Sequence, residues 1–99
     1  MQTKSPPRAL YTFRERVERV VTAIPRGKTL TYQEVARQAG NAKAARAVAN
    51  IMAANYSSNI PCHRVIRSDG KAGGYNRGGE EAKIKLLLRE GWLPKSTPV

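Results

Sequence analysis

The stretch LTYQEVARQAGNAKAARAVANIMAAN, residues 30–55, decides the fold of this chain. Thr31 is followed three residues later by Glu34, a capping-box pair that predicts a helix over residues 32–39. Gly40 ends that helix, because glycine is common just after a helix C-terminus. An alanine-rich helix follows at once, so the stretch predicts a helix-turn-helix. Helical hairpins also occur in proteins that bind no nucleic acid, so the motif alone leaves function open.

The second helix of the motif, predicted over residues 41–55 with Asn41 as its N-cap, carries few long side chains. Alanine is the best helix former, so helix stability alone explains its abundance, but small side chains also let a helix approach a surface closely. Only Lys43 and Arg46 project charge from it. A helix that reads bases in the major groove displays more polar side chains. This helix is therefore predicted to lie in a shallow groove and contact the nucleic-acid backbone.

Three further elements are predicted around this motif. Apolar residues at steps of three and four predict a helix over residues 9–24, and another from about Gly79 to Gly91. Asp69-Gly70 is a hairpin signal, and a hairpin after a helix-turn-helix is a wing. We therefore expect a mainly α fold, a winged helix-turn-helix with about four helices and a short β-hairpin wing. The apolar residues predicted to face the core from the first, third and last helices are Leu10, Phe13, Val17, Val20, Val21, Ile24, Val48, Ile51, Met52, Ile84, Leu87 and Leu88.

The chain has 99 residues, and we expect one small domain over residues 9–93, between a loose lead-in (1–8) and a loose tail (94–99). Eighteen Lys and Arg residues against seven Asp and Glu give a formal net charge of +11. This charge predicts an anionic partner, most often nucleic acid and less often an acidic membrane surface. No apolar stretch has the length of a membrane span and no signal peptide is recognisable, so a cytoplasmic or nuclear protein is expected.

Cys62 and His63 are the only cysteine and the only histidine, and they are adjacent in the sequence after Pro61. One cysteine excludes an internal disulfide, and the pair is too small for a structural zinc site, so no metal and no cofactor are expected. In extended backbone, neighbouring side chains point to opposite faces, so His63 is expected to reach the thiol only through a water. The residues alone leave two interpretations open: a reactive thiol with its base, or a buried inert cysteine beside a hydrogen-bonded histidine.

Four segments resemble those of the O6-alkylguanine-DNA alkyltransferases, in order and at similar spacing: TYQEVA (31–36), GNAKAARAVANIMAAN (40–55), IPCHRVIRSDG (60–70) and KIKLLLREG (83–91). The resemblance covers roughly residues 10–93. It implies direct-reversal DNA repair, in which a cysteine takes the alkyl group from guanine O6 in double-stranded DNA after minor-groove binding and nucleotide flipping. Because the chain has no second cysteine to resolve a thioether, we expect one alkyl group per chain and no turnover. A monomer is expected.

The resemblance also implies a role for each matching residue. The implied catalytic residues are Cys62 as acceptor, His63 as the base acting through water, Glu90 as the carboxylate that orients the imidazole, Asn55 as organiser of the active-site turn, and Tyr32, which helps rotate the target and meets the leaving guanine. The implied DNA contacts are Arg46, a finger that fills the gap left by the flipped nucleotide, with Tyr32, Lys43, Ala45, Ala49 and Arg64. The implied base pocket contains Tyr75, Asn76 and Met52.

The chain departs from the family pattern in ways that keep a second function in view. Asn76 replaces the usual serine that helps bind guanine O6, Arg77 looks inserted, and Tyr56 stands where proline is usual. Only about nine residues precede the first predicted helix, where many family members carry a further domain. Alkyltransferase-like proteins are similarly short but replace the cysteine; they bind the lesion and hand it to excision repair. The alternative function is thus non-enzymatic lesion binding. A winged-helix transcription regulator would need base-reading side chains, which the helix predicted over residues 41–55 lacks.

Overall fold

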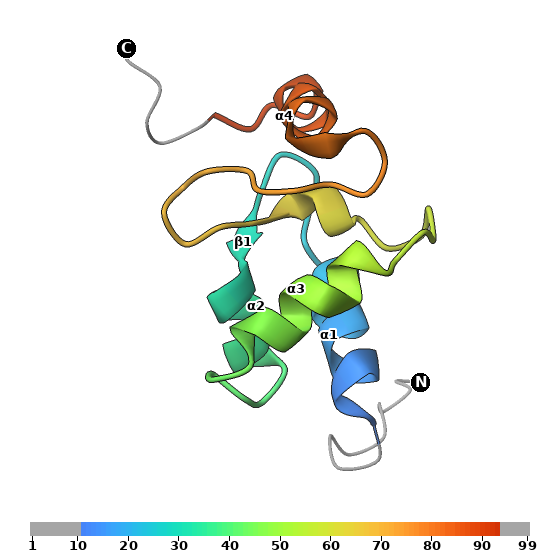
Figure 1. Cartoon of the computed structure of the whole chain (residues 1–99), viewed down its shortest axis with the longest axis vertical. Coiled ribbons are helices and arrows are strands. Elements are labelled where there is room, and N and C mark those ends of the chain that lie inside the picture. The colour runs from blue at the N-terminus through green and yellow to red at the C-terminus, as the bar shows by residue number, and fades with distance from the viewer. Residues whose placement is uncertain (1–10, 94–99) are drawn as a thin grey trace, which may run out of the picture.

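The computed structural model describes residues 11–93, so the predictions made for residues 1–10 and 94–99 lie outside the described residues. The elements, in chain order, are α1 (Phe13–Thr22), β1 (Leu30–Thr31), α2 (Tyr32–Gln38), α3 (Ala45–Ala53), the 3-10 helix η2 (Cys62–Arg64), β2 (Val65–Ile66) and α4 (Gly79–Arg89). The fold is mainly α with a small two-stranded sheet, as predicted for the fold class. In Figure 1, α1, α2 and α3 lie together and α4 lies at the opposite end of the molecule.

Capping boxes set the start of the first two helices. At α2, the Glu34 amide donates to Thr31 Oγ1 at 3.0 Å and the Thr31 amide donates to Glu34 Oε1 at 2.8 Å, as predicted. Thr12 and Glu15 form the same arrangement before α1, at 3.1 and 2.8 Å. That second box explains why α1 begins at Phe13, later than the predicted residue 9, because a capped turn satisfies the first free amides of a helix.

The third helix also begins later than predicted. Asn41 does not cap it; its side-chain oxygen accepts from the Lys43 amide at 3.1 Å, and its carbonyl accepts from the Ala44 amide at 3.1 Å. These bonds close a separate turn, a conformation that asparagine side chains favour. Helix α3 therefore starts at Ala45, with Ala44 before it offering no side-chain cap.

The core lies between the first three helices and the segment that carries Cys62. Its buried members are Val17, Val21, Ile24, Val35, Ala36, Ala39, Val48, Met52, Cys62 and Val65. Ile66, Leu87 and Trp92 form a smaller buried cluster beneath α4. One part of the core prediction is wrong: Leu88 is 48% exposed, whereas Lys83, one helical turn before Leu87 on the same face, is only 1% exposed.

The predicted β-hairpin wing is wrong in its strand pairing. β2 pairs with β1 in parallel, with Leu30 opposite Val65 and Thr31 opposite Ile66. The Asp69-Gly70 turn does form, closed by the Gly70 amide on the Arg67 carbonyl at 3.1 Å. No strand follows it within the described residues, because the next segment carries Gly73-Gly74, and glycine disfavours strands. The strand that pairs with β2 is therefore β1, which leads directly into α2.

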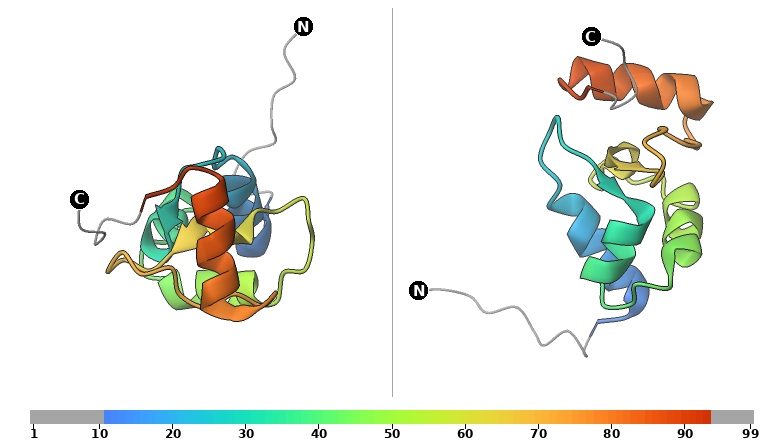
Figure 2. Two further views of the ribbon diagram at one scale, coloured as in Figure 1. Left: turned by 90° about the horizontal axis from the view of Figure 1, so that it is seen from above. Right: turned by 90° about the vertical axis from the view of Figure 1, so that its left-hand side faces the viewer.

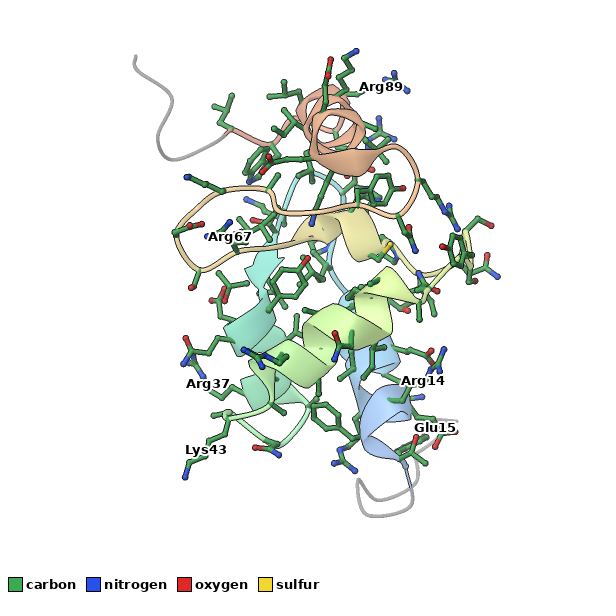
Figure 3. The ribbon with its side chains drawn as sticks, in the orientation of Figure 1. Arg14, Glu15, Arg37, Lys43, Arg67 and Arg89 are labelled. Atoms are coloured by element: carbon green, nitrogen blue, oxygen red, sulfur yellow. The ribbon has the colours of Figure 1, made fainter. Side chains whose placement is uncertain are left out.

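Two segments, η2 and the loop before α4, lie between α4 and the other helices (Figure 2). Figure 2 (right) shows α4 above the other helices, with η2 and the segment before α4 between them. Charged side chains surround this body: Figure 3 labels Arg14, Glu15, Arg37, Lys43, Arg67 and Arg89 around its periphery. No helix in residues 11–93 is long and apolar enough to cross a membrane.

Candidate functional site

Cys62 lies in a single 3-10 turn and not in extended backbone, so this local prediction is wrong. The Arg64 amide donates to the Pro61 carbonyl at 2.9 Å, and the Cys62 amide donates to the Ile60 carbonyl at 2.8 Å. The alternation of an extended strand therefore does not apply here. The 3-10 turn still directs the two side chains to different places. Cys62 is 6% exposed and packs in the core, whereas His63 points toward Glu90 at the end of α4.

Asn55 holds the loop that leads into this turn. Its side-chain oxygen accepts from the Ser57 amide at 3.1 Å, and its side-chain nitrogen donates to the Ile60 carbonyl at 3.3 Å. The residue is 5% exposed, and its own amide donates to the Met52 carbonyl at 3.1 Å. Asn55 thus links the end of α3 to the residue before Pro61, a geometry that suits both a cap and an organiser of the turn.

A buried carboxylate stands behind His63. Glu90, whose side chain is 8% exposed, places Oε2 at 2.9 Å from His63 Nε2. Arg64 grips the same carboxylate with two bonds of 3.0 Å and donates a third, of 2.8 Å, to the Ile24 carbonyl. Arg64 was predicted to contact DNA, but its side chain is turned inward because it pairs with this buried charge.

The electrostatics of this cluster indicate which ring nitrogen of a neutral His63 carries the proton. The hydrogen bonds from Arg64, with those from His63, lower the pKa of Glu90 to about 2 against the opposing effect of burial. Glu90 is therefore a carboxylate at neutral pH and accepts the proton of His63 Nε2. Neutral His63 then carries its lone pair on Nδ1, the arrangement that a general base requires.

Gly27 makes room for the backbone of Glu90. Its φ of +85° is a conformation that side chains with a Cβ rarely adopt, and an added Cβ would lie 2.8 Å from the Glu90 carbonyl oxygen. The loop after α1 therefore closes against the C-terminal end of α4. This contact and the Arg64–Ile24 bond hold that end of α4 near η2.

A pocket of about 430 Å³ opens in front of the Cys62 thiol. It is lined by Tyr32, Ala49, Asn50, Met52, Ala53, Cys62, Gly74, Tyr75 and Asn76. The structure thus brings the three residues predicted for a base pocket, Met52, Tyr75 and Asn76, together with Tyr32 and Cys62. Burial, then the nearby charge of a Cys62 thiolate, raises the pKa of Tyr32 and of Tyr75. Both phenols keep their protons at neutral pH and can donate hydrogen bonds into the pocket.

Lys83 is a charged residue beside this pocket that the sequence reasoning missed. Its Nζ donates to Tyr32 Oη and to the Gly74 carbonyl, each at 3.3 Å, and lies 5.5 Å from the centre of the Tyr32 ring. Burial lowers the pKa of Lys83 to about 8, although the Cys62 and Glu80 charges oppose that shift. The ammonium group therefore remains mostly protonated at pH 7. Helical spacing could have revealed it, since Lys83 shares a face with Leu87.

A second, shallower hollow adjoins the pocket along α2 and α3. Its lining residues are Tyr32, Gln33, Ala42, Lys43, Ala45, Arg46, Ala49, Arg67 and Ser68. Five of the six predicted DNA contacts meet there, and Tyr32 and Ala49 line both hollows. Figure 3 shows the labelled Arg37, Lys43 and Arg67 on this side of the molecule. Arg67, which also pairs with Asp69 at 2.8 Å, was not among the predicted contacts.

The comparison with known families identifies this arrangement. The profile described as "6-O-methylguanine DNA methyltransferase, DNA binding domain" matches residues 12–92. The chain belongs to the 6-O-methylguanine DNA methyltransferase family. A methylated-DNA–protein-cysteine methyltransferase of Methanothermobacter thermautotrophicus is 52% identical over 80 residues, which cover 80% of this chain and 44% of that protein. The mouse protein of the same name is 51% identical over 73 residues, 73% of this chain and 34% of that protein. The chain thus spans less than half the length of these relatives.

Solved structures agree with this membership in the 6-O-methylguanine DNA methyltransferase family. Mycobacterium tuberculosis OGT in complex with DNA has a TM-score of 0.74 at 42% identity, covering 81% of this chain and 49% of that one. Schizosaccharomyces pombe Atl1, in complex with damaged DNA containing O6-carboxymethylguanine, has a TM-score of 0.71 at 34% identity, covering 80% of this chain and 75% of that one. The family profile spans residues 12–92, which contain the whole helix-turn-helix and the cysteine segment.

Proposed function

We propose that this chain repairs double-stranded DNA by moving an alkyl group, above all methyl, from guanine O6 to Cys62, once per chain. The observation that carries the proposal is the placement of Cys62. Its thiol faces a pocket beside the helix-turn-helix hollow, and the following residue is a histidine oriented by a buried carboxylate. A non-reactive buried cysteine would need neither the pocket nor the oriented base.

The reaction follows from these groups. His63, directly or through one water, takes the thiol proton, and the sulfur attacks the alkyl carbon. A carbon–sulfur bond forms as the bond from carbon to guanine O6 breaks, and the electron pair of that bond moves onto the purine. Tyr32, protonated and hydrogen-bonded by Lys83, is placed to supply the proton that makes neutral guanine the leaving group. The thioether stays on the protein.

DNA binding in this proposal uses the hollow along α2 and α3. The chain carries a net charge of +11, which gives affinity for phosphates and a strong salt dependence. The alanine-lined surface of α3 lets the helix lie close to a shallow groove, and Arg46 projects from it. A duplex hides guanine O6 in the base stack, so the nucleotide must be flipped into the pocket, which costs a few kcal/mol. The relatives solved in complex with DNA support DNA binding by this chain. We further propose a monomer in the cytoplasm or nucleus, with residues 9–93 as the acting unit.

The second candidate is lesion binding without transfer, with excision repair completing the task. The similarity to Atl1 bound to damaged DNA and the altered loop at Asn76 favour this candidate. Presence of the cysteine in the pocket favours transfer instead.

A mass measurement decides between these candidates. The protein is mixed with an excess of duplex containing O6-methylguanine, and intact mass and peptide masses are recorded. We expect every chain to gain one methyl group on Cys62 and none to gain two, while the repaired bases never outnumber the chains. Tight binding of the duplex with no mass change would support the lesion-binding alternative, and several repaired bases per chain would contradict single use.

Replacing Arg46 should separate reaction on DNA from reaction with a free base. Arg46 is exposed on α3 and lines the hollow but not the pocket. We expect Arg46→Ala to slow repair of a duplex about ten- to a hundredfold, because support for the flipped state is lost, while reaction with free O6-benzylguanine changes less than about twofold. Arg89→Ala on α4 is the matched control for loss of one exposed arginine. Equal losses on both substrates would contradict the finger role.

A further inference from the structure

The three departures from the family pattern meet at one place in the structure. The side-chain nitrogen of Asn76 donates to two carbonyl oxygens at the end of α3, that of Ala53 at 2.9 Å and that of Asn55 at 2.6 Å. The inserted Arg77 donates through Nη2 to the carbonyl of Tyr56, the residue that stands where proline is usual. Two consecutive loop residues thus bind three carbonyls within four residues of the chain. We call this set of contacts, from Asn76 and Arg77 to residues 53–56, the loop clasp.

The orientation of the Asn76 amide follows from its partners. Exchanging its oxygen and nitrogen would bring that oxygen against two carbonyl oxygens at hydrogen-bond distance, which is repulsive. Asn76 Oδ1 is buried and has no hydrogen-bond partner among the described residues. The two donor bonds offset the cost of leaving this buried oxygen unpaired. Both side-chain N–H groups are therefore occupied, and Asn76 has none left for guanine O6.

The loop clasp completes a set of anchors on the loop before α4. At its other side, the Gly73 amide donates to Glu80 Oε2 at 3.0 Å, and Lys83 Nζ donates to the Gly74 carbonyl at 3.3 Å. The loop is thus fixed to α4 at residues 73–74 and to the end of α3 at residues 76–77. Tyr75 lies between these anchors and lines the pocket in front of Cys62. Figure 2 (right) shows this loop passing between α4 and α3.

We propose that Asn76 and Arg77 are positioning residues that hold this pocket closed around small adducts, so that the chain prefers O6-methylguanine over bulky O6-alkylguanines. The proposal rests on the proposed function, whose base pocket it makes specific. A loop fixed on both sides cannot move outward without breaking hydrogen bonds, and a large alkyl group needs that movement. In the family pattern the serine at this position helps bind guanine O6. Here Asn76 instead holds the loop that lines the pocket against the end of α3.

Binding to a protein that cannot transfer the alkyl group tests this specificity. In a Cys62→Ser background, Kd values are measured for duplexes containing O6-methylguanine and O6-benzylguanine. We expect the preference for the methyl lesion to fall about tenfold with Asn76→Asp, whose carboxylate repels the two carbonyls, since each hydrogen bond contributes roughly a factor of five. Asn76→Ser should lower it similarly without adding charge. The matched control is Asn41→Asp, which adds the same charge in the turn before α3, lines neither the pocket nor the hollow, and can keep the bond from the Lys43 amide. An unchanged preference, or an equal change in the control, would overturn the proposal.

Hydrogen exchange of the free protein supplies a readout that needs neither DNA nor reaction. Amides of residues 73–79 should exchange about tenfold faster in Asn76→Asp and in Asn76→Ser than in the parent, and at the parent rate in Asn41→Asp. Equal exchange in all four proteins would show that no clasp restrains the loop. The proposed function fails on a different result, the lack of a methyl gain in the wild-type protein, so the two failures are distinguishable.

Discussion

Cys62→Ser should abolish alkyl transfer while leaving lesion binding in place. Serine has nearly the shape of cysteine, but its hydroxyl is far harder to deprotonate, and removing a reaction's nucleophile lowers rates by several orders of magnitude. We expect transfer from an O6-methylguanine duplex to fall at least about a thousandfold. The measurement is the fraction of chains that gain a methyl group over time, with the Kd for the same duplex as a check on folding.

The burial of Cys62 adds a condition to this experiment. The thiol is part of the core, so a serine hydroxyl placed there lowers stability by roughly 1–3 kcal/mol if it finds no partner. Cys62→Ala, which buries no polar group, is the second variant, and thermal melts of both identify any loss of fold. A methylated peptide from either variant would place the acceptor elsewhere and contradict the role of Cys62.

Glu90→Gln should have the next largest effect, on the rate and not on DNA affinity. The neutral amide keeps the shape of the carboxylate but no longer stabilises a protonated His63, and it offers one acceptor where Arg64 and His63 now share two oxygens. We expect transfer to slow about a hundredfold or more, because general-base catalysis by an oriented histidine contributes at least that much. The Kd for the lesion duplex should change less than about threefold, because Glu90 lines neither the pocket nor the hollow along α2 and α3.

The matched control for this substitution is Glu81→Gln, on the same helix. Glu81 is exposed and pairs with Lys85 at 3.4 Å, so its neutralisation should leave both rate and affinity unchanged. A loss of affinity in Glu90→Gln as large as its loss of rate would assign Glu90 a structural role.

The same carboxylate should make stability depend on acid pH. Because the pKa of Glu90 is lowered to about 2, its contribution is fully present above its ordinary value of 4.5 and is lost as pH falls from there through about 2. We expect this group to remove on the order of 1–2 kcal/mol of unfolding free energy over that range, after allowance for solvent screening. Urea unfolding between pH 2 and 7 measures this change in unfolding free energy. For Glu90→Gln, the plot of unfolding free energy against pH should lack the decrease that Glu90 causes.

Local sequence signals predicted the parts of this fold that depend on neighbours in the chain. Thr31 and Glu34 predicted the start of α2, because a capping box is complete within four residues. The same logic explains why the pair Thr12 and Glu15, once recognised, would have corrected the start of α1. The resemblance then grouped pocket residues from four segments, and the structure brings Tyr32, Met52, Cys62, Tyr75 and Asn76 to one pocket.

Three of the features that the sequence did not predict depend on partners far along the chain. Arg64 looked like a DNA contact because its partner, Glu90, is 26 residues away. Lys83 was not singled out: helical spacing can indicate its buried face, but nothing local shows that its ammonium group donates to Tyr32, 51 residues away. β2 was expected to pair with the segment after Asp69-Gly70, yet its partner is β1, which precedes it by more than thirty residues. Burial and pairing of this kind are decided by tertiary contacts, which override local preference.

The parallel pairing of β1 with β2 has a mechanical consequence. β1 runs directly into α2, and η2 runs directly into β2, so backbone bonds join the base of the DNA-facing helices to the residues that follow Cys62. In the described chain, a paired strand and a packed core lie between the hollow along α2 and α3 and Cys62. In the proposed reaction, the sulfur is therefore held in place by the core, and the flipped nucleotide moves to the sulfur.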